Sequence, residues 1–391
     1  MVATREEGGE KHGPEPTATG RGVPPPDPSM VLAGTGLCGA DQVRWPSPSI
    51  PRRSVMHLRM SFSIAVAGAF VLAPTTPEPV AAQGAPGGVD ELVEWEVEWG
   101  GRTRDPSVSP DGTIWFVGQA GNYVARFDPA DESFRRYEIE EGANPHTVIV
   151  DEDGYGWYAG NRNATITRVH PETGELRVFP TGEARDPHTM VFDGEGGIWF
   201  TSQQSNRVGH IDMATGEYRL VTPHDNDRAR PYGIVLDDEG HPWVSLFGED
   251  EVVRIHPESL EITRFNKAQE ESRGRRLEVL NDGFVWSVDE PHGILARIEI
   301  ATGEVTRYPM PGGQDSRPYA ITKDDRGVLW ISETGPEKQL VAFNPASESF
   351  IAVHQVSNNI RHMAFDEERG AIWFGTDSNY LGRVLTRPSS Q

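Results

Sequence analysis

Seven tryptophans recur along this chain at nearly constant intervals, and this repeat constrains the fold more than any other feature. The intervals are 42, 42, 44, 43, 44 and 43 residues, and the positions are Trp115, Trp157, Trp199, Trp243, Trp286, Trp330 and Trp373. Each tryptophan lies in the second of four short apolar runs, which are separated by Asp/Gly-rich or ATGE-type turns. A four-stranded unit of this length is typical of a propeller blade, which buries its apolar faces only against neighbouring blades. The sequence therefore predicts an all-β, seven-bladed β-propeller.

The two ends of the repeat predict how the ring closes. The last unit, "RHMAFDEERGAIWFGTDSNYLGRVLTRP", contains only three strand-like runs. A fourth run, "ELVEWEVEW" over residues 91–99, alternates in the same way but precedes the first complete unit. Pairing this N-terminal strand into the last blade would remove exposed strand edges. We therefore predict one propeller over residues 91–387, with its last blade completed by the N-terminal strand.

The segment before the repeat has a different character. Residues 1–55 are rich in Gly, Pro and charge without periodicity, which indicates disorder or a translation start assigned too far upstream. Residues 56–82 are typical of a signal peptide, because an apolar stretch too short for a membrane span is followed by small residues ending at Ala82. We expect an exported protein, periplasmic or secreted. Its one cysteine, Cys38, lies upstream, so the mature chain should lack disulfides.

The charge of the chain limits its partners. The formal net charge is −23, and the first 82 residues contain seven basic and seven acidic side chains, so the acidity belongs to the propeller. Such a surface repels phosphate backbones. We expect no nucleic-acid partner, no membrane span and a monomeric protein.

A propeller places its candidate site where the inner strands converge on the central channel. Counted without gaps, the residue eleven places before each tryptophan is Arg104, His146, His188, Tyr232, Arg275, Tyr319 and His362. Every one of these side chains can donate a hydrogen bond, and none is aliphatic. Such a ring is suited to an anionic or carbonyl-bearing ligand. The alternative is structural, since a narrow channel needs polar side chains that hydrogen-bond one another and water.

Acidic residues are distributed unevenly in a second register, three and four places after each tryptophan. They occur only in the last three blades, as Asp289, Glu290, Glu333 and Asp377. The last blade contains both His362 and Asp377, on adjacent predicted strands. A histidine and a carboxylate that converge can provide a general base or hold a cation.

Other conspicuous patterns favour structure over chemistry. The clusters "SPDG", "DEDG", "DGEGG", "DDEG" and "DDRG" fall where the first hairpin of a blade must turn, and they lack the spacing of a calcium loop. The chain has no GxSxG, HExxH, P-loop or paired CxxC motif. The common hydrolase, metalloprotease and nucleotide-binding functions therefore have no support.

The repeated phrases resemble a known family. "NPHTVIV", "DPHTMVF", "RPYGIVL" and "RPYAIT", followed by "IWF" or "LWIS" and then by "NRVGHI" or "NYLGRV", are similar to the streptogramin B (virginiamycin B) lyase propellers over residues 91–387. The resemblance implies a Mg²⁺-dependent lyase that linearises a cyclic depsipeptide antibiotic by elimination. It also implies a base at His362 and an acidic metal-site residue at Asp377. Two positions differ from the family: Tyr319 replaces a histidine, and Ile360 replaces an acidic residue.

Three functions follow from these observations. The first is an exported lyase in which His362 is the base, Tyr319 is a second catalytic candidate, and Asp377 and Glu333 hold Mg²⁺. Its small-molecule or cyclic peptide substrate would be bound by Arg104, His146, His188, Tyr232 and Arg275. The second is a non-catalytic propeller in which the ring binds a small anionic ligand, a peptide or a protein partner. The third is a gluconolactonase-like hydrolase, whose Glu, Asn and Asp metal ligands have no clear counterpart here.

Overall fold

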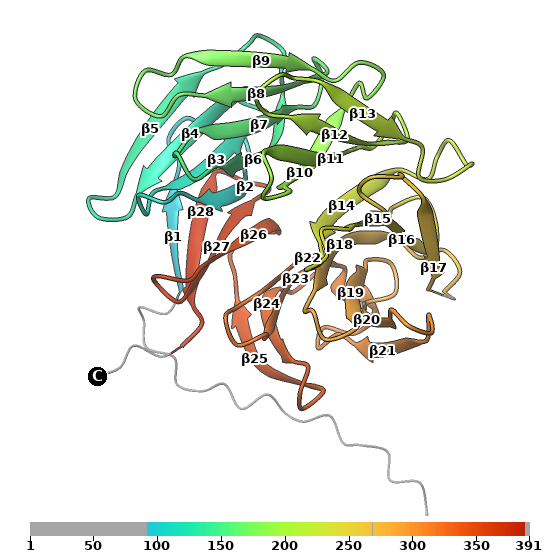
Figure 1. The fold of residues 1–391 in the computed structure, drawn as a ribbon. Coiled ribbons are helices and arrows are strands. Elements are labelled where there is room, and N and C mark those ends of the chain that lie inside the picture. The colour runs from blue at the N-terminus through green and yellow to red at the C-terminus, as the bar shows by residue number, and fades with distance from the viewer. Residues whose placement is uncertain (1–91, 268, 388–391) are drawn as a thin grey trace, which may run out of the picture. The chain divides into compact units, whose positions relative to one another are not determined.

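The computed structural model describes residues 92–267 and 269–387, which form a ring of seven four-stranded antiparallel sheets (Figure 1). The predicted seven-bladed propeller is therefore confirmed. The expected N-terminal extension, residues 1–55, and the expected signal peptide, residues 56–82, lie outside the described residues. Within the described part, no helix is long and apolar enough to cross a membrane. A short 3-10 helix, η1 (Gln314–Ser316), precedes the sixth blade.

Each blade is an antiparallel meander that runs from the channel outward. The inner strands are β2 (Thr103–Val108), β6 (Pro145–Val150), β10 (Pro187–Phe192), β14 (Pro231–Leu236), β18 (Gly274–Val279), β22 (Pro318–Lys323) and β26 (Ile360–Asp366). The second strands, which carry the repeated tryptophans, are β3 (Ile114–Gly118), β7 (Gly156–Gly160), β11 (Gly197–Ser202), β15 (Pro242–Leu246), β19 (Phe284–Asp289), β23 (Leu329–Thr334) and β27 (Ala371–Thr376).

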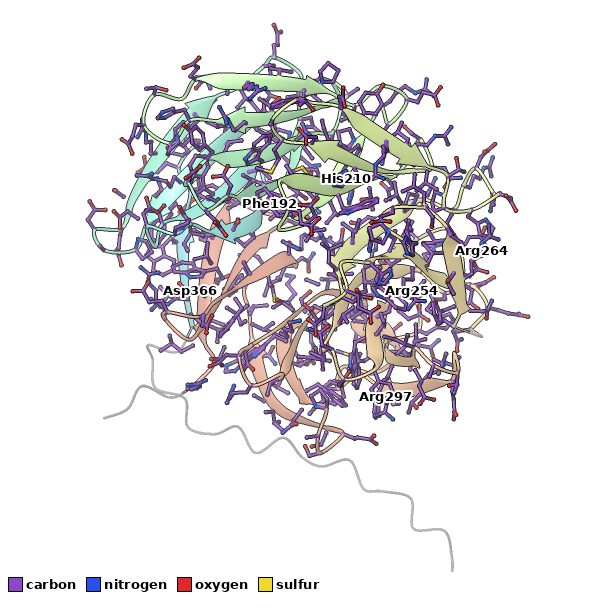
Figure 2. The ribbon with its side chains drawn as sticks, viewed as in Figure 1. Phe192, His210, Arg254, Arg264, Arg297 and Asp366 are labelled. Carbon is purple, nitrogen blue, oxygen red and sulfur yellow. The ribbon has the colours of Figure 1, made fainter. Side chains whose placement is uncertain are left out.

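The two remaining strands of each blade form its outer part. The third strands are β4 (Tyr123–Asp128), β8 (Thr165–Val169), β12 (Arg207–Asp212), β16 (Glu251–Ile255), β20 (Ile294–Glu299), β24 (Lys338–Asn344) and β28 (Tyr380–Leu385). The outermost strands are β5 (Ser133–Glu138), β9 (Leu176–Pro180), β13 (Tyr218–Val221), β17 (Ile262–Asn266), β21 (Val305–Pro309), β25 (Ser349–Gln355) and β1 (Leu92–Glu96). Charged side chains such as Arg264 of β17 lie at the outer rim (Figure 2).

The N-terminal strand closes the ring as predicted. β1 pairs antiparallel with β28 and becomes the fourth strand of the last blade, with Trp95 opposite Leu381. The Trp95 ring stacks on Trp373 of the same blade, with the ring centroids 5.5 Å apart. It also contacts Phe127 of the first blade at 4.9 Å. One side chain thus packs against both blades that meet at the closure.

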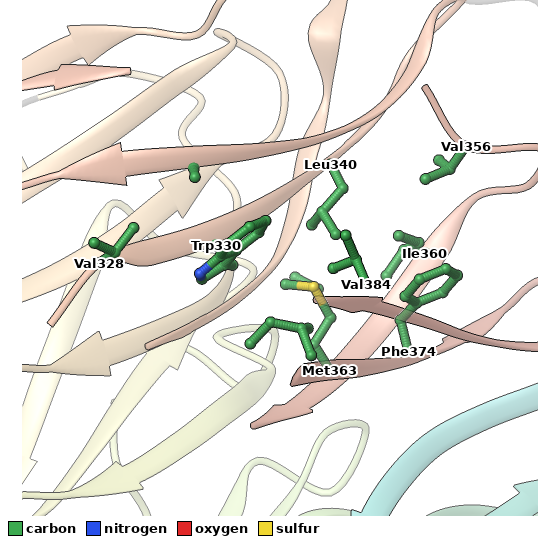
Figure 3. Packing of buried hydrophobic residues seen from close by; sticks show 11 residues of the cluster. Val328, Trp330, Leu340, Val356, Ile360, Met363, Phe374 and Val384 are labelled. Carbon is green, nitrogen blue, oxygen red and sulfur yellow. The ribbon is translucent and has the colours of Figure 1, made fainter. Parts of the chain in front are cut away.

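The hydrophobic core lies between blades, because both faces of each sheet are covered by neighbouring sheets. Figure 3 shows one such cluster, between the sixth and last blades. Trp330 and Leu340 pack there against Ile360 and Phe374, and all four side chains are buried. Burial of such side chains is the main source of stability in a fold of this kind. It also leaves the inner edges of the blades free to present polar groups to the channel.

The Asp/Gly clusters form hairpin turns, in agreement with the prediction. In the second blade one oxygen of Asp151 accepts a hydrogen bond from the backbone N–H of Tyr155 at 2.8 Å. The other oxygen accepts one from the indole N–H of Trp157, also at 2.8 Å. Gly154 completes the turn in the left-handed region, with φ at 83°. The same indole-to-carboxylate bond joins Trp243 to Asp237, Trp330 to Asp324 and Trp373 to Asp366.

Every inner strand has a register shift near its start, and in the second to sixth blades it falls at the same place. In the second blade Pro145 pairs with Gly160 and Val148 pairs with Tyr158, so two residues of β6 stand opposite one residue of β7. Strict alternation would turn these two side chains to opposite faces of the sheet, whereas a bulge redirects them. In the first, second, third and fifth blades the second of these residues also has a polar side chain that hydrogen-bonds to the others across the ring: Asp105, Thr147, Thr189 and Arg276.

Candidate functional site

Two layers of side chains lie at the centre of the ring. We call the residue that follows the first paired residue of each inner strand the upper layer: Arg104, His146, His188, Tyr232, Arg275, Tyr319 and Arg361. The next residue along each strand forms the lower layer: Asp105, Thr147, Thr189, Gly233, Arg276, Ala320 and His362. Six of the seven residues predicted for the ring thus occupy the upper layer.

The seventh predicted residue, His362, does not lie in the upper layer. In the first six blades the tryptophan pairs with the residue eight places before it, but Trp373 pairs with Ala364, nine places before it. The last blade has one extra residue in its first hairpin, since Asp366 lies seven rather than six places before the tryptophan. The count without gaps is therefore wrong by one residue in this blade. Arg361 takes the upper-layer position, and His362 belongs to the lower layer.

One half of the upper layer is a stack of rings. The ring centroids of His146 and His188 are 3.5 Å apart, and His188 is 4.4 Å from Tyr232. The hydroxyl of Tyr232 shares a hydrogen bond with the hydroxyl of Tyr319, which comes from the sixth blade. All four side chains are buried. The structure therefore brings these predicted residues into one connected group.

The other half of the upper layer consists of three arginines. Each one donates a hydrogen bond to the side chain four places after the tryptophan of its own blade. The pairs are Arg104 Nη1 to Gln119 Oε1 at 2.7 Å, Arg275 Nε to Glu290 Oε2 at 2.6 Å, and Arg361 Nε to Asp377 Oδ2 at 2.7 Å. Their guanidinium groups are thereby held at the channel in defined orientations.

The positive charge of the arginines affects the pKa values of Tyr232 and Tyr319. Burial by itself raises the pKa of Tyr319, but the charges of Arg104, Arg275 and Arg361 outweigh it and lower that pKa. Burial, together with the neighbouring Tyr319, raises the pKa of Tyr232. The centre of the upper layer therefore favours negative charge on an oxygen atom.

A buried ion pair crosses the centre of the ring at the lower layer. Arg276 Nη2 lies 2.9 Å from Asp105 Oδ2, although these residues come from the fifth and first blades. Thr147 donates a hydrogen bond to the same carboxylate oxygen at 2.7 Å, and Arg276 donates one to Thr189 at 3.1 Å. Burial by itself raises the pKa of Asp105. The opposing effects of Arg276 and then His362 are larger, and they lower this pKa to about 2. The carboxylate is therefore ionised at neutral pH.

The histidines of the channel are neutral at physiological pH. Burial, and then the charge of Arg276, lowers the pKa of His362 to about 3. Burial likewise holds the pKa values of His146 and His188 well below 6.5. His362 is partly buried, and its Nδ1 atom has no hydrogen-bond partner among the described residues. In the tautomer that carries its proton on Nε2, Nδ1 is a buried acceptor without a partner among the described residues.

The residues expected to hold Mg²⁺ do not form a metal site. Asp377 accepts two hydrogen bonds from Arg361, and burial and this guanidinium have opposite effects on its pKa, which is lowered overall. Glu333 is buried and accepts a bond from the backbone N–H of Gly312 at 3.0 Å. Ile360 lies in the core between blades. Within residues 92–267 and 269–387, no three His, Cys, Asp or Glu side chains converge as metal ligands would. This donor set does not fit Mg²⁺.

Sequence reasoning missed three charged residues at the channel: Asp105, Arg276 and Arg361. Each follows or precedes a predicted ring residue directly, so strict strand alternation assigned it to the other face. Two signals could have found them. Charged residues are unusual at these positions of an inner strand, and the extra residue in the last hairpin is visible in the spacing of Asp366 and Trp373.

Two hollows lie apart from the upper-layer residues. One, of about 520 Å³, is lined by Arg185, Arg207 and Tyr218. The other, of about 450 Å³, lies beside Glu278 and Lys323. Neither contains an upper-layer residue, and the polar groups without partners in the channel have no counterpart in their linings. The channel is therefore the stronger candidate site.

Fold and site together define the class of this protein: a seven-bladed β-propeller with an arginine-rich central channel. Residues 103–385 match the model of the Virginiamycin B lyase family, and the chain belongs to this family. A search of curated proteins finds no match.

The fold of this chain is similar to those of several solved protein structures. The chain is similar to a streptogramin B lyase, with 21% identity, a TM-score of 0.68, and coverage of 75% of this chain and 96% of the other. It is also similar to a catalytically inactive histidine-to-alanine variant of Staphylococcus aureus virginiamycin B lyase with quinupristin, with 23% identity, a TM-score of 0.69, and coverage of 76% and 99%. The extracellular domain of a hybrid two-component system from B. thetaiotaomicron matches at 17% identity and a TM-score of 0.61, with coverage of 76% and 43%. At these identities the likeness concerns the fold.

Proposed function

We propose that the central channel binds a small anionic ligand through a carboxylate or carbonyl oxygen. The observation that carries this proposal is the state of Arg104. Its side chain is only 7% exposed, yet its one side-chain hydrogen bond among the described residues goes to the neutral amide of Gln119, and its Nε atom has no partner. A buried guanidinium without a bound carboxylate is unfavourable until a counter-charge reaches it. Asp105 and Asp377 stabilise the charge of Arg104 from nearby, but neither is hydrogen-bonded to it among the described residues, so the guanidinium can still take a direct carboxylate partner.

The surroundings of Arg104 support the same ligand. The guanidinium groups of Arg275 and Arg361 lie 4.7 and 4.4 Å from the centre of the Tyr319 ring. One of the Tyr232 and Tyr319 hydroxyls donates to the other, which leaves one O–H at the same place to donate to a ligand. Because an ion pair crosses the centre of the ring at the lower layer, the ligand would enter from the upper side. The exterior carries a large negative charge, so an anion would be attracted only where these arginines gather.

Calorimetric titration of the full chain with sodium benzoate tests the proposal. We expect Arg104→Gln to weaken benzoate binding by about tenfold or more, because a charge-assisted hydrogen bond is lost. Arg264→Gln is the matched control, since Arg264 has the same charge but lies exposed on β17. Undetectable binding of benzoate to the wild type, or equal affinity of wild type and Arg104→Gln, would contradict the proposal.

A second candidate function is an elimination lyase, which family membership and His362 favour. In this reaction the His362 imidazole would take a proton from the carbon next to a carbonyl group. A carbon–carbon double bond would form, the adjacent carbon–oxygen bond would break, and a carboxylate would leave. The charge of Arg104, which His362 experiences, would stabilise the developing negative charge on the carbonyl oxygen. The product would have the same mass as the substrate.

The low pKa of His362 weighs against this second candidate, because a weakly basic imidazole is a poor general base at neutral pH. An anionic substrate would offset part of the arginine charge that lowers this pKa, so substrate binding would increase the basicity of His362. The family's Mg²⁺ has no place in this scheme, since the donor set does not fit it.

Incubation with quinupristin, followed by mass spectrometry, tests the lyase function. A ring-opened product of unchanged mass that disappears with His362→Ala would establish elimination. A product heavier by one water would establish hydrolysis. Absence of any product would leave anion binding without turnover as the function of the channel.

We also propose that the chain is exported, from the pattern of residues 56–82. N-terminal sequencing of the protein recovered from the periplasm or the medium tests this, and the expected first residue is Gln83. Recovery only in the cytoplasm, with the N-terminal segment intact, would contradict it.

A further inference from the structure

Three blades carry an arginine in the upper layer, and the arginine makes the same kind of side-chain hydrogen bond in each. The partner in one blade differs from the partners in the other two. In each, the upper-layer arginine donates a hydrogen bond to the residue four places after the tryptophan. In the fifth and last blades this residue is a carboxylate, Glu290 or Asp377. In the first blade it is an amide, Gln119. The same geometry thus occurs twice with a counter-charge and once without.

We propose that the channel ligand is a monocarboxylate held by Arg104, and that Gln119 is the residue that determines this charge preference. The proposal rests on the anion-binding function above and specifies its ligand class. A glutamate at this position would have almost the same shape as the glutamine and would neutralise Arg104. The amide instead accepts a hydrogen bond that orients the guanidinium while its positive charge remains available.

The charges of the two layers agree with one negative charge on the ligand. The guanidinium groups are those of Arg104, Arg275, Arg276 and Arg361, and the carboxylates are those of Asp105, Glu290 and Asp377. Counting the layer residues and the two carboxylates hydrogen-bonded to their arginines, four positive groups face three negative groups, which leaves one positive charge. The three channel histidines are neutral and do not change this balance.

A second carboxylate on the ligand would meet unfavourable surroundings. The other two upper-layer arginines already bind carboxylates, and both pairs are largely shielded from water. The exposed fractions of the side chains are 17% and 18% for Arg275 and Glu290, and 20% and 31% for Arg361 and Asp377. A dicarboxylate would have to displace one of these carboxylates or lie against it, and like charges in a shielded site repel each other.

The experiment compares benzoate with phthalate, which adds a second carboxylate to the same ring. Calorimetric titration of the wild type should show benzoate binding about tenfold more tightly than phthalate, because the second charge is repelled. Gln119→Glu should weaken benzoate binding by about tenfold, since Arg104 becomes neutralised. The reciprocal variant Glu290→Gln should increase phthalate affinity by a similar factor, because a second guanidinium becomes available.

The outcomes separate this inference from the function on which it rests. If benzoate binds the wild type and Gln119→Glu binds it equally well, the monocarboxylate inference is overturned while anion binding stands. Tighter binding of phthalate than benzoate to the wild type would also overturn it. If neither compound binds the wild type, both proposals fail. Circular dichroism melting curves of the two variants establish that each is folded, and the gain expected for Glu290→Gln cannot arise from misfolding.

Discussion

The carboxylate of Asp105 in the first blade accepts a hydrogen bond from the guanidinium of Arg276 in the fifth blade, at 2.9 Å and across 171 residues of sequence. Both side chains are buried, and both belong to the lower layer. Such a contact can form only where the blades meet at the centre of the ring. The pair therefore joins distant blades directly and forms the floor of the candidate site.

Removing one partner of this ion pair should lower the free energy of unfolding. We expect Asp105→Asn to lower the free energy of unfolding by about 3–5 kcal/mol, because Arg276 would remain buried without its counter-charge. Asn is a suitable replacement, since position 105 has a φ of 46° and Asn tolerates the left-handed region. Urea unfolding followed by tryptophan fluorescence measures the difference. The double variant Asp105→Asn, Arg276→Met should recover part of the loss, and a double variant less stable than either single variant would refute this explanation.

Acid should destabilise the propeller before its carboxylates are protonated. The pKa values of His146 and His188 lie well below 6.5 in the folded state, and that of His362 is about 3, so below pH 6.5 the unfolded chain binds protons that the folded chain does not. Stability is therefore complete above pH 6.5 and falls as the pH drops toward 3, by up to about 1.4 kcal/mol per pH unit for each histidine. Unfolding free energies measured from pH 7 to pH 5 should show a shallower slope for His188→Asn. An unchanged slope would contradict the assignment.

The ion pair at Asp105 also loses stability in acid, but over a lower pH range than the histidines. Its folded pKa, about 2, lies below its usual value of 3.8, so the stability it contributes is complete above pH 4 and is lost as the pH falls toward 2. The difference in unfolding free energy between wild type and Asp105→Asn should therefore shrink over that range. A difference that stays constant down to pH 2 would show that the carboxylate is not the source of the stabilisation.

Magnesium should not bind in the channel. We expect millimolar MgCl₂ to leave the melting temperature unchanged and to give no binding heat, because the guanidinium of Arg361 already occupies the Asp377 carboxylate. Asp377→Asn should behave like the wild type in the same titration. A stabilisation by Mg²⁺ that this variant abolishes would place a metal at Asp377 and overturn the conclusion drawn from the donor set.

Closure of the ring should depend on Trp95. Its ring packs between Trp373 and Phe127, so Trp95→Ala should cost about 3 kcal/mol of unfolding free energy through the lost aromatic contacts and the cavity left behind. Trp99→Ala is the matched control, because Trp99 follows the same strand and is 38% exposed. Guanidinium unfolding curves compare the two variants. Equal losses would show that burial at the closure is not what makes Trp95 important.

Much of the candidate site could be predicted, with one systematic error. The count from the tryptophans identified Arg104, His146, His188 and the other upper-layer residues of the first six blades, because equivalent positions in a repeat occupy equivalent places. It failed at Arg361, where one extra residue in the hairpin shifts the register. The same count could not show that Asp377 is paired with an arginine, since it assigns positions along each strand and not the hydrogen bonds between them.

The sequence by itself determined the number of blades, their strand order and the closure by the N-terminal strand. These follow from a local requirement repeated seven times, namely that each four-stranded unit must cover its apolar faces with neighbours. Only the tertiary structure decided which polar side chains meet in the channel. The bulges turn consecutive residues such as His146 and Thr147 inward, against the alternation of a regular strand. Contacts such as Asp105 with Arg276 arise from closing the ring, and no local pattern in the chain encodes them.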